Sequence, residues 1–203
     1  MKRFYRTLTH NYSEGGLSQL FRKALVTFGR PIWSESEWNI YQHHGASGVP
    51  PNSKVECRIV NFDQLTGVGY YKAVAFPEVI RQRFDASERC YGFYTDGCLA
   101  TIGWSTRDHL ELDRGHILPC PGAIGLFDFF TFPAYRSRGI YTSALVLLVN
   151  MLHQEGDQIA YIAADPNNMP SIKGIERAGF RPAFKVGRKR RLGLSIASRS
   201  TGA

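Results

Sequence analysis

The 203-residue chain has a formal net charge of +8 and is 43% hydrophobic and 13% aromatic. This composition excludes a disordered or fibrous chain, and the length suits one domain with a substantial core. The positive charge indicates acidic partners: nucleic acid, an anionic membrane, a phosphorylated co-substrate or an acidic carrier protein. Because the four cysteines form no CxxC pair, we expect reduced cytosolic thiols, with neither a zinc site nor a secreted disulfide scaffold.

Residues 1–50 are predicted to form an N-terminal arm with one amphipathic helix. In "GGLSQLFRKALVTFGRP" the apolar residues from Leu17 to Phe28 recur at helical spacing, with Arg22 and Lys23 on another face. Such a helix usually packs on its own protein, and contact with an anionic bilayer is the alternative. The arm has no apolar signal core, and no run of about 18 uncharged apolar residues occurs in the sequence. We therefore expect a cytoplasmic protein, at most peripheral to a membrane.

The main domain is predicted to span residues 51–187. A loop rich in Gly, Pro and Ser, residues 43–54, leads into it. A strand is expected at Val55–Val60, and a helical segment at Tyr70–Asp85, which Pro77 should interrupt or start. The domain therefore begins with a strand followed by a helix.

Two strand-like runs, "RCYGFYT" and "CLATIGWST", come next. Asp96-Gly97 joins them, and this dipeptide is the strongest short-range signal for a two-residue hairpin turn. In such a hairpin Cys98 faces Thr95, so Cys90 and Cys98 are not cross-strand partners. The segment after the hairpin, residues 107–122, is expected to be irregular.

The second half of the domain alternates strands and helices. The expected elements are a strand at Ala123–Phe132 that Pro133 ends, a helix at Gly139–Leu152, a strand at Gln158–Ala164, a helix at Asn168–Gly179 and a strand at Phe180–Gly187. The first of these helices is uncharged and apolar on nearly every face, so it should be sandwiched or lie at an interface. The order β-α-β-β-β-α-β-α-β indicates a mixed α/β (α+β) fold. Residues 188–203 are expected to be a basic, disordered tail.

The segment "YRSRGIY", residues 135–141, has the composition of an anion-binding turn. Gly139 allows a close backbone turn, and a helix that begins there presents unpaired amides and the positive end of its dipole. Arg136 and Arg138 add positive charge. The alternative is a solvated strand-to-helix turn. The sequence contains neither GxxxxGK[ST] nor GxGxxG, which argues against ATP-type and dinucleotide-type sites.

Two longer segments resemble the GCN5-related N-acetyltransferase (GNAT) superfamily. "FFTFPAYRSRGIYTSAL" is similar to its central motif, a strand followed by a [QR]-x-x-G-x-[GA] loop that binds the coenzyme A pyrophosphate. "NNMPSIKGIERAGFRP" is similar to its second motif, an Asn followed by a helix ending in Gly-Phe. The resemblance covers residues 55–186 and implies a mostly antiparallel central sheet with flanking helices and a splayed V between its central strands. A narrower resemblance is to acetyltransferase-like proteins of polysaccharide and cell-envelope assembly.

The resemblance implies an acyl-CoA site built largely from backbone groups. The residues that match the pyrophosphate loop are Arg136, Ser137, Arg138, Gly139, Ile140 and Tyr141. Tyr141 stands where Gly or Ala is usual, so its ring either crowds the phosphates or packs away from them. Phe129, Phe130 and Thr131 match strand residues whose backbone binds the pantetheine arm and polarises the thioester carbonyl, as an oxyanion hole does. Asn168 matches an asparagine that contacts the donor, and capping its own helix is the alternative.

The residues that move protons depart from the family pattern. Ala163 and Ile175 occupy the positions of the usual glutamate and tyrosine. Asp128 is the first candidate base, because a carboxylate buried in an apolar strand would become more basic; a structural carboxylate is the alternative. Tyr141 and Tyr135 are candidate hydroxyl groups near the thiol, with structural roles as the alternative. Four residues before the central strand are candidates for an acceptor pocket: His109, Glu111, Asp113 and His116.

The predicted reaction transfers an acetyl or other acyl group from acyl-CoA to an amine by direct attack in a ternary complex, without a metal. The expected acceptor is a small-molecule or sugar amine. The alternatives are an acyl-carrier-protein-dependent enzyme of the same fold and a catalytically silent acyl-CoA-binding regulator, and a homodimer is left open. Nucleic-acid binding through "GRKRRLG" is disfavoured, because this run lacks interleaved aromatic residues.

Overall fold

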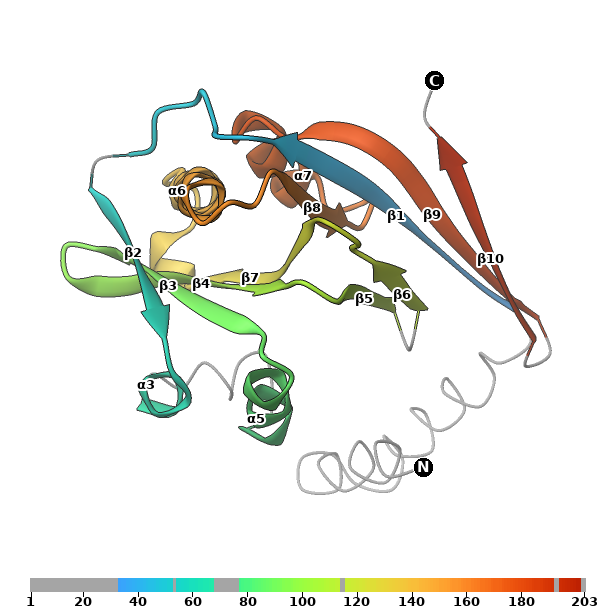
Figure 1. Ribbon diagram of the computed structural model, residues 1–203, viewed down its shortest axis with the longest axis horizontal. Coiled ribbons are helices and arrows are strands. Elements are labelled where there is room, and N and C mark those ends of the chain that lie inside the picture. The colour runs from blue at the N-terminus through green and yellow to red at the C-terminus, as the bar shows by residue number, and fades with distance from the viewer. Residues whose placement is uncertain (1–32, 53, 68–76, 114–115, 192–193, 202–203) are drawn as a thin grey trace. The chain divides into compact units, whose positions relative to one another are not determined.

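The computed structural model describes residues 33–52, 54–67, 77–113, 116–191 and 194–201 (Figure 1). The described residues form two compact units, one within residues 37–186 with 200–201, the other from residues 33–36 with 187–191 and 194–199. The amphipathic helix expected in the N-terminal arm lies outside the described residues, as does the first part of the helical segment expected at Tyr70–Asp85.

The larger unit is built on one sheet with the strand order β9-β1-β8-β7-β4-β3-β2. Its strands are the later part of β1 (Trp33–His44), then β2 (Val55–Val60), β3 (Arg89–Thr95), β4 (Cys98–Thr106), β7 (Ile124–Thr131) and β8 (Ile159–Ala164), and the first part of β9 (Arg181–Arg191). Its helices are α3 (Phe62–Gly67), α5 (Pro77–Asp85), α6 (Ile140–Gln154) and α7 (Met169–Arg177). β7 and β8 are parallel, whereas the pairs β1/β8, β2/β3, β3/β4 and β4/β7 are antiparallel. The expected mixed fold with a mostly antiparallel sheet is therefore confirmed.

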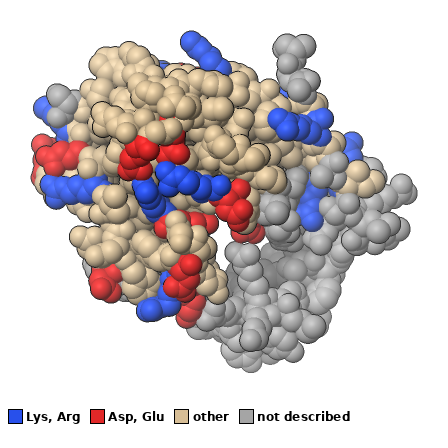
Figure 2. Space-filling view, viewed as in Figure 1, with Lys and Arg blue, Asp and Glu red and all other residues tan. Residues whose placement is uncertain are grey.

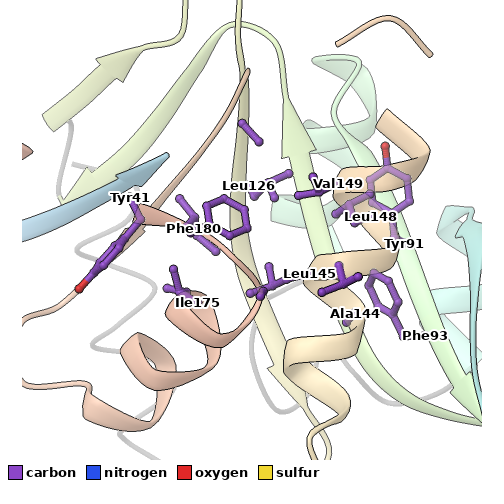
Figure 3. Packing of buried hydrophobic residues seen from close by; sticks show 14 of the residues in the cluster. Tyr41, Tyr91, Phe93, Leu126, Ala144, Leu145, Leu148, Val149, Ile175 and Phe180 are labelled. Atoms are coloured by element: carbon purple, nitrogen blue, oxygen red, sulfur yellow. The ribbon is translucent and has the colours of Figure 1, made fainter. Parts of the chain in front are cut away.

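Helices cover both faces of the sheet. On one face α6 and α7 pack against a large apolar cluster that includes Leu126, Leu145 and Phe180 (Figure 3). On the other face α3 and α5 contribute Leu65 and Ile80 to a smaller cluster around Trp104, and Figure 1 shows these two helices opposite α6. The sheet is thus the middle layer of three, which explains why α6 is uncharged: it is buried along most of its length.

The two parallel strands at the centre pair over only a short distance. β7 and β8 are in register at three positions, from Ile124 with Ala160 to Leu126 with Ile162. Beyond Leu126, β7 continues beside β4 and β8 continues beside β1. One edge of β7 is therefore left unpaired by its neighbour, as the splayed V of the sequence prediction requires.

The predicted hairpin is confirmed. Thr95 pairs with Cys98, and the turn residues Asp96 and Gly97 have φ values of 50° and 75°. Positive φ at both positions is the geometry of a type I′ turn, whose twist matches that of the flanking strands. Cys90 lies opposite Trp104, several positions from Cys98.

The segment expected to be irregular contains a second, two-stranded sheet. β5 (His109–Asp113) pairs with β6 (His116–Pro119). Leu110 and Leu112 are buried in a cluster with Cys120 and Phe184. The residues of this cluster are far apart in sequence, and their packing stabilises the two strands. The charged residues of this segment obscure the alternation of apolar and polar residues that would predict strands.

The smaller unit contains a strand where a disordered tail is expected. β9 continues to Arg191 and pairs with β10 (Leu194–Thr201). The Ser198 hydroxyl donates to the Gly187 carbonyl at 3.4 Å, and Lys189 Nζ lies 3.2 Å from Glu35 Oε1. The basic residues 188–191 are therefore part of β9, and one of them forms an ion pair with a glutamate of β1.

β1 lies within residues 1–50, which the sequence analysis expected to form an arm separate from the main domain. Its residues Asn39–His44 pair with β8 inside the sheet. Ile40 and Tyr41 are both buried, on opposite faces. Because a strand buried on both faces shows no alternation, the period of its sequence does not identify it.

Charges on the surface are mixed in sign. Figure 2 shows acidic and basic side chains interspersed on one face. Arg89 pairs with Glu155, and Arg107 Nη2 lies 2.6 Å from Asp157 Oδ2. This pattern is typical of a solvated surface. Within the described residues, no helix has the length and apolar character needed to cross a bilayer.

Candidate functional site

The junction between β7 and α6 leaves backbone amides without partners. α6 begins at Gly139, which has φ 71° and no side-chain cap. The first hydrogen bond of the helix runs from the Ser143 amide to the Gly139 carbonyl (3.1 Å). An α-helix starting here has no internal acceptor for the amides of residues 139–142. A Cβ at Gly139 would meet nothing within 4 Å among the described residues, so the space beside the Gly139 Cα is open.

The turn before the helix adds two further features of an anion site. Ser137 has a φ of 60°, so Ser137 and Gly139 are both left-handed, with one residue between them. Turns of this kind direct neighbouring amides to one side. Residues 136–139 are exposed. Together with the helix dipole, this geometry favours a phosphate group.

The two arginines of the turn have different surroundings. Arg136 Nε donates to the Thr131 carbonyl (3.0 Å), and its guanidinium lies 5.7 Å from the Phe130 ring centre. Arg136 therefore holds the turn against the end of β7. The Arg138 guanidinium lies 5.8 Å from the ring centre of Tyr135 at the surface. Arg138 can turn towards a bound anion at little cost.

The edge of β7 that faces β8 in the V adds further backbone groups to the helix amides described above. The Phe132 amide donates to the Ala100 carbonyl (3.0 Å), which directs the backbone groups of Phe132 and, by alternation, Phe130 towards β4. The backbone groups of Phe129 and Thr131 therefore face the V. Of the three strand residues predicted to bind the donor, Phe130 thus directs its backbone groups towards β4, and the Thr131 carbonyl in the V accepts from Arg136.

A β-bulge sets the position of Phe129. Trp104 pairs with Phe127 and Ile102 with Phe130, so β7 has one extra residue, Asp128, with a φ of 47°. The Phe129 ring occupies the space above Gly103, where any Cβ would collide with it. The bulge thus anchors the Phe129 ring and turns the Asp128 side chain outward.

Asp128 is not buried, which corrects the expectation from the sequence. Its side chain is 46% exposed and forms an ion pair with Arg83 of α5. The Arg83 guanidinium lies 5.0 and 5.1 Å from the ring centres of Trp104 and Phe127. The bulge is the physical reason for the exposure, because a regular strand would have turned this position towards the core. The rings fix Arg83, and Arg83 fixes the carboxylate.

Glu88 is a neighbouring carboxylate that the sequence analysis missed. Its Oε2 lies 3.9 Å from Arg83 Nε. Burial raises the pKa of Glu88, and the positive charges of Arg83 and His109 oppose this shift. No motif marks this residue; its only signal is an acidic side chain directly before the strand Arg89–Thr95. Of the four residues predicted to line an acceptor pocket, His109 and Glu111 lie on β5. The side chains of the other two, Asp113 and His116, are outside the described part of the chain.

Tyr141 packs away from the turn. Its hydroxyl lies 3.3 Å from Ser171 Oγ of α7. Its ring contacts Phe129, at 5.6 Å between centres, and a Cβ at Gly174 would come within 2.5 Å of its Cδ1. Burial raises the pKa of Tyr141 to about 12, against the opposing effect of the Ser171 hydrogen bond. The large residue at this position is therefore accommodated by a glycine on the facing helix.

Tyr135 and Asn168, the other candidates, are engaged locally. The Tyr135 hydroxyl interacts with Cys98, and this hydrogen bond raises the pKa of Tyr135. Asn168 Oδ1 accepts a hydrogen bond from the Ser171 amide (3.3 Å), which makes it the N-cap of α7. Among the side chains that the structure describes, no three of His, Cys, Asp or Glu are grouped to hold a metal ion.

Residues 59–180 match the model of the Acetyltransferase (GNAT) family. The chain belongs to this family. The matched region includes the whole first segment that carries the resemblance and the second segment as far as Phe180, as well as the bulge and the uncapped helix. No curated protein matches the chain.

Solved structures show the same fold. An acetyltransferase of the GNAT family from Novosphingobium aromaticivorans is 16% identical, with a TM-score of 0.52 over 84% of this chain and 66% of that one. A GNAT family acetyltransferase from Colwellia psychrerythraea is 18% identical, with a TM-score of 0.53 over 92% and 63%. AAC(6')-Ib, solved with paromomycin and acetyl-CoA, is 16% identical, with a TM-score of 0.53 over 73% and 94%. This chain spans slightly less than two-thirds of the length of the first two.

Proposed function

We propose that this GNAT protein transfers an acyl group from acyl-CoA to an amine by direct attack in a ternary complex. One observation carries the proposal: the free amides of residues 139–142 follow directly on the free edge of β7 in the V. A pyrophosphate at the helix amides and a pantetheine arm along the edge of β7 would both be bound mostly by backbone groups. The residues therefore fit acyl-CoA.

Each part of the donor has a counterpart in the chain. The pyrophosphate would lie against the turn of residues 136–140, with the exposed Arg138 as a positive charge beside it. The thioester carbonyl would accept a hydrogen bond from the Phe129 amide, which the bulge holds in place. A donor fixed before the reaction stabilises negative charge on that oxygen as the amine attacks.

Asp128 is proposed to receive the amine. It directly precedes Phe129, its carboxylate is exposed, and Arg83 restrains it. A carboxylate there would attract the acceptor's ammonium group and take its proton before attack. Asn168 is proposed to act as a helix cap and not as a donor contact, because its oxygen already holds the Ser171 amide.

Thermal unfolding of the chain with coenzyme A, acetyl-CoA and acyl carrier protein tests the donor. We expect coenzyme A and acetyl-CoA to raise the melting temperature in proportion to the logarithm of their concentration, and acyl carrier protein to have no effect. A shift with acyl carrier protein alone would support the carrier-dependent alternative. No shift with either coenzyme refutes the proposed donor.

Turnover distinguishes an enzyme from a silent acyl-CoA-binding member of the family. Release of free thiol from acetyl-CoA is measured with a panel of small amines and amino sugars, including an aminoglycoside, since AAC(6')-Ib was solved with paromomycin. Thiol release that depends on one amine supports the enzyme. Tight coenzyme binding without release across the panel would support the silent member.

A further inference from the structure

The strand at the far end of the sheet has one unpaired edge. β2 is the last strand in the order and pairs with β3 alone among the described strands. The pair that closes a two-residue turn, Thr95 with Cys98, exchanges hydrogen bonds, so the neighbouring Tyr94 directs its backbone groups towards Glu56 on β2. By alternation, Val55, Cys57 and Ile59 direct theirs away from β3. The Val55 amide already donates to the Asn52 carbonyl (3.0 Å), so at this position the carbonyl is the group that a partner strand would use.

The charges of β2 are complementary to themselves in one register. Glu56 and Arg58 flank Cys57, form an ion pair with each other at 2.7 Å within the chain, and are both exposed, with side-chain exposures of 66% and 57%. Pairing with a second β2 would extend this ion pair across the two strands. In an antiparallel pairing of β2 with a second β2, the odd-numbered residues must pair with one another. Centring the two-fold axis on Cys57 then places each Glu56 opposite an Arg58. Centring it on Glu56 or Arg58 would place like charges opposite each other, which is unfavourable.

The apolar residues of β2 agree with the same register. Ile59 is 61% exposed and lies on the same face of the strand as Val55 and Cys57. A groove of about 480 Å³ runs beside this face. It is lined by β2 residues 55–58 and by Leu147, Asn150, Met151 and Gln154 of α6. The two-fold on Cys57 brings the partner's Ile59 opposite Val55, where it can enter this groove.

We propose that two copies of the chain associate through antiparallel pairing of their β2 strands about a two-fold axis at Cys57. The Cys57 amide donates to the carbonyl of the partner's Cys57, and the Ile59 amide donates to that of the partner's Val55. Glu56 pairs with the partner's Arg58 on one face, and Ile59 enters the partner's groove on the other. The surface is separate from the β7–α6 junction, so the inference does not depend on the proposed function.

The size of the contact predicts its strength. β2 has six residues, about 20 Å of strand. One such strand and one groove from each copy form a small interface, at the weak end of specific complexes. We therefore expect a dimer in exchange with its monomer, and light scattering over a concentration series up to about 1 mM should show the molar mass rising.

Charge reversal is the decisive test because it can be undone. Glu56→Arg makes both charged positions basic, and Arg58→Glu makes both acidic, so each variant alone should dimerise about tenfold more weakly or worse. Mixing the two variants in equal amounts should restore association as a heterodimer. The double variant Glu56→Arg with Arg58→Glu should restore the homodimer. Circular dichroism and its thermal unfolding curve check that each variant is folded.

Four results would overturn the proposal. The first is a wild-type chain that stays monomeric over the whole series, and the second is a dimer that single reversals leave unchanged. The third is a mixture or a double variant that fails to associate. The fourth comes from oxidation with copper phenanthroline, which should link Cys57 to the partner's Cys57: the linked dimer should vanish in Cys57→Ser and persist in Cys98→Ser, and the reverse contradicts the register.

Discussion

Two helices begin at the ends of the parallel strands β7 and β8, and their first turns are built differently. α6 starts at a left-handed glycine with no side-chain cap. α7 starts at Asn168, whose side chain accepts from the Ser171 amide. In the loop before α7, the Asn167 amide donates to Asp165 Oδ1 (2.8 Å). The loop before α6 carries two arginines and no acid.

The difference shows which helix start is available to a ligand. At α7 the Asn168 side chain accepts from the Ser171 amide, Pro170 has no amide hydrogen to offer, and a carboxylate, Asp165, precedes the helix. At α6 the amides are left free and the surrounding charge is positive. The β8–α7 connection thus has a structural role, whereas the similar β7–α6 connection is a candidate phosphate site.

The strongest way to break the comparison is to make α6 resemble α7. In Gly139→Asp a carboxylate would reach the free amides and repel phosphate, so we expect coenzyme A affinity to fall about 100-fold. Isothermal calorimetry measures the change. Gly122→Asp is the matched control, because Gly122 has a φ of 69° and equally open space. If both variants lose the same affinity, backbone strain is responsible and the free amides are not the site.

The bulge of β7 provides a second test, on catalysis rather than binding. Asn tolerates positive φ, so Asp128→Asn should keep the bulge. We expect kcat/KM for the amine to fall about 100-fold with coenzyme A affinity unchanged. Asp157→Asn, which removes a carboxylate paired with Arg107, should retain activity. Equal activity of the two variants would exclude Asp128 from the proton transfer.

Tyr141 lies between the two helices, and its ionisation is expected to affect stability at high pH. Its pKa is about 12 in the folded chain, above the usual value near 10, so from pH 10 upward the unfolded chain loses this proton first. The free energy of unfolding should therefore fall between pH 10 and 12, and less steeply in Tyr141→Phe. Urea unfolding at several pH values measures this.

The same variant tests whether the hydroxyl acts as an acid. Because the Tyr141 hydroxyl is bonded to Ser171, we expect Tyr141→Phe to keep kcat within about threefold. A loss of about 100-fold would instead identify Tyr141 as the acid suggested by its position in the motif.

The smallest expected effect is at the start of α7. Asn168→Ala removes the cap and should lower the free energy of unfolding by about 1 kcal/mol, with coenzyme A affinity unchanged. Asn168→Asp keeps an oxygen acceptor and should be close to wild type in stability. A marked loss of coenzyme A affinity in the alanine variant would show that Asn168 contacts the donor.

Local signals in the sequence predicted a large part of the fold. Asp96-Gly97 specifies its turn through positive φ, and Asn168 specifies a helix start through a side-chain oxygen. Pro77 stands at the first position of α5. Each of these depends on a few adjacent residues, so no knowledge of distant contacts was needed.

The missed elements depend on partners that are distant in sequence. β1 is recognisable only from its place beside β8, and β5 from the burial of Leu110 with Phe184. Asp128 was expected to be buried because the residues around it are apolar. A register shift against β4 exposes it, and nothing in "GLFDFFT" marks that shift.

The sequence by itself determined the family resemblance, the candidate phosphate turn and the order of most elements, because these reside in short contiguous segments. Only the tertiary structure decided that Asp128 faces solvent beside Arg83, that Tyr141 packs on Gly174, and that β2 pairs with β3 alone among the strands that the structure describes. Side-chain direction and strand pairing depend on what each segment packs against. A single segment cannot contain that information.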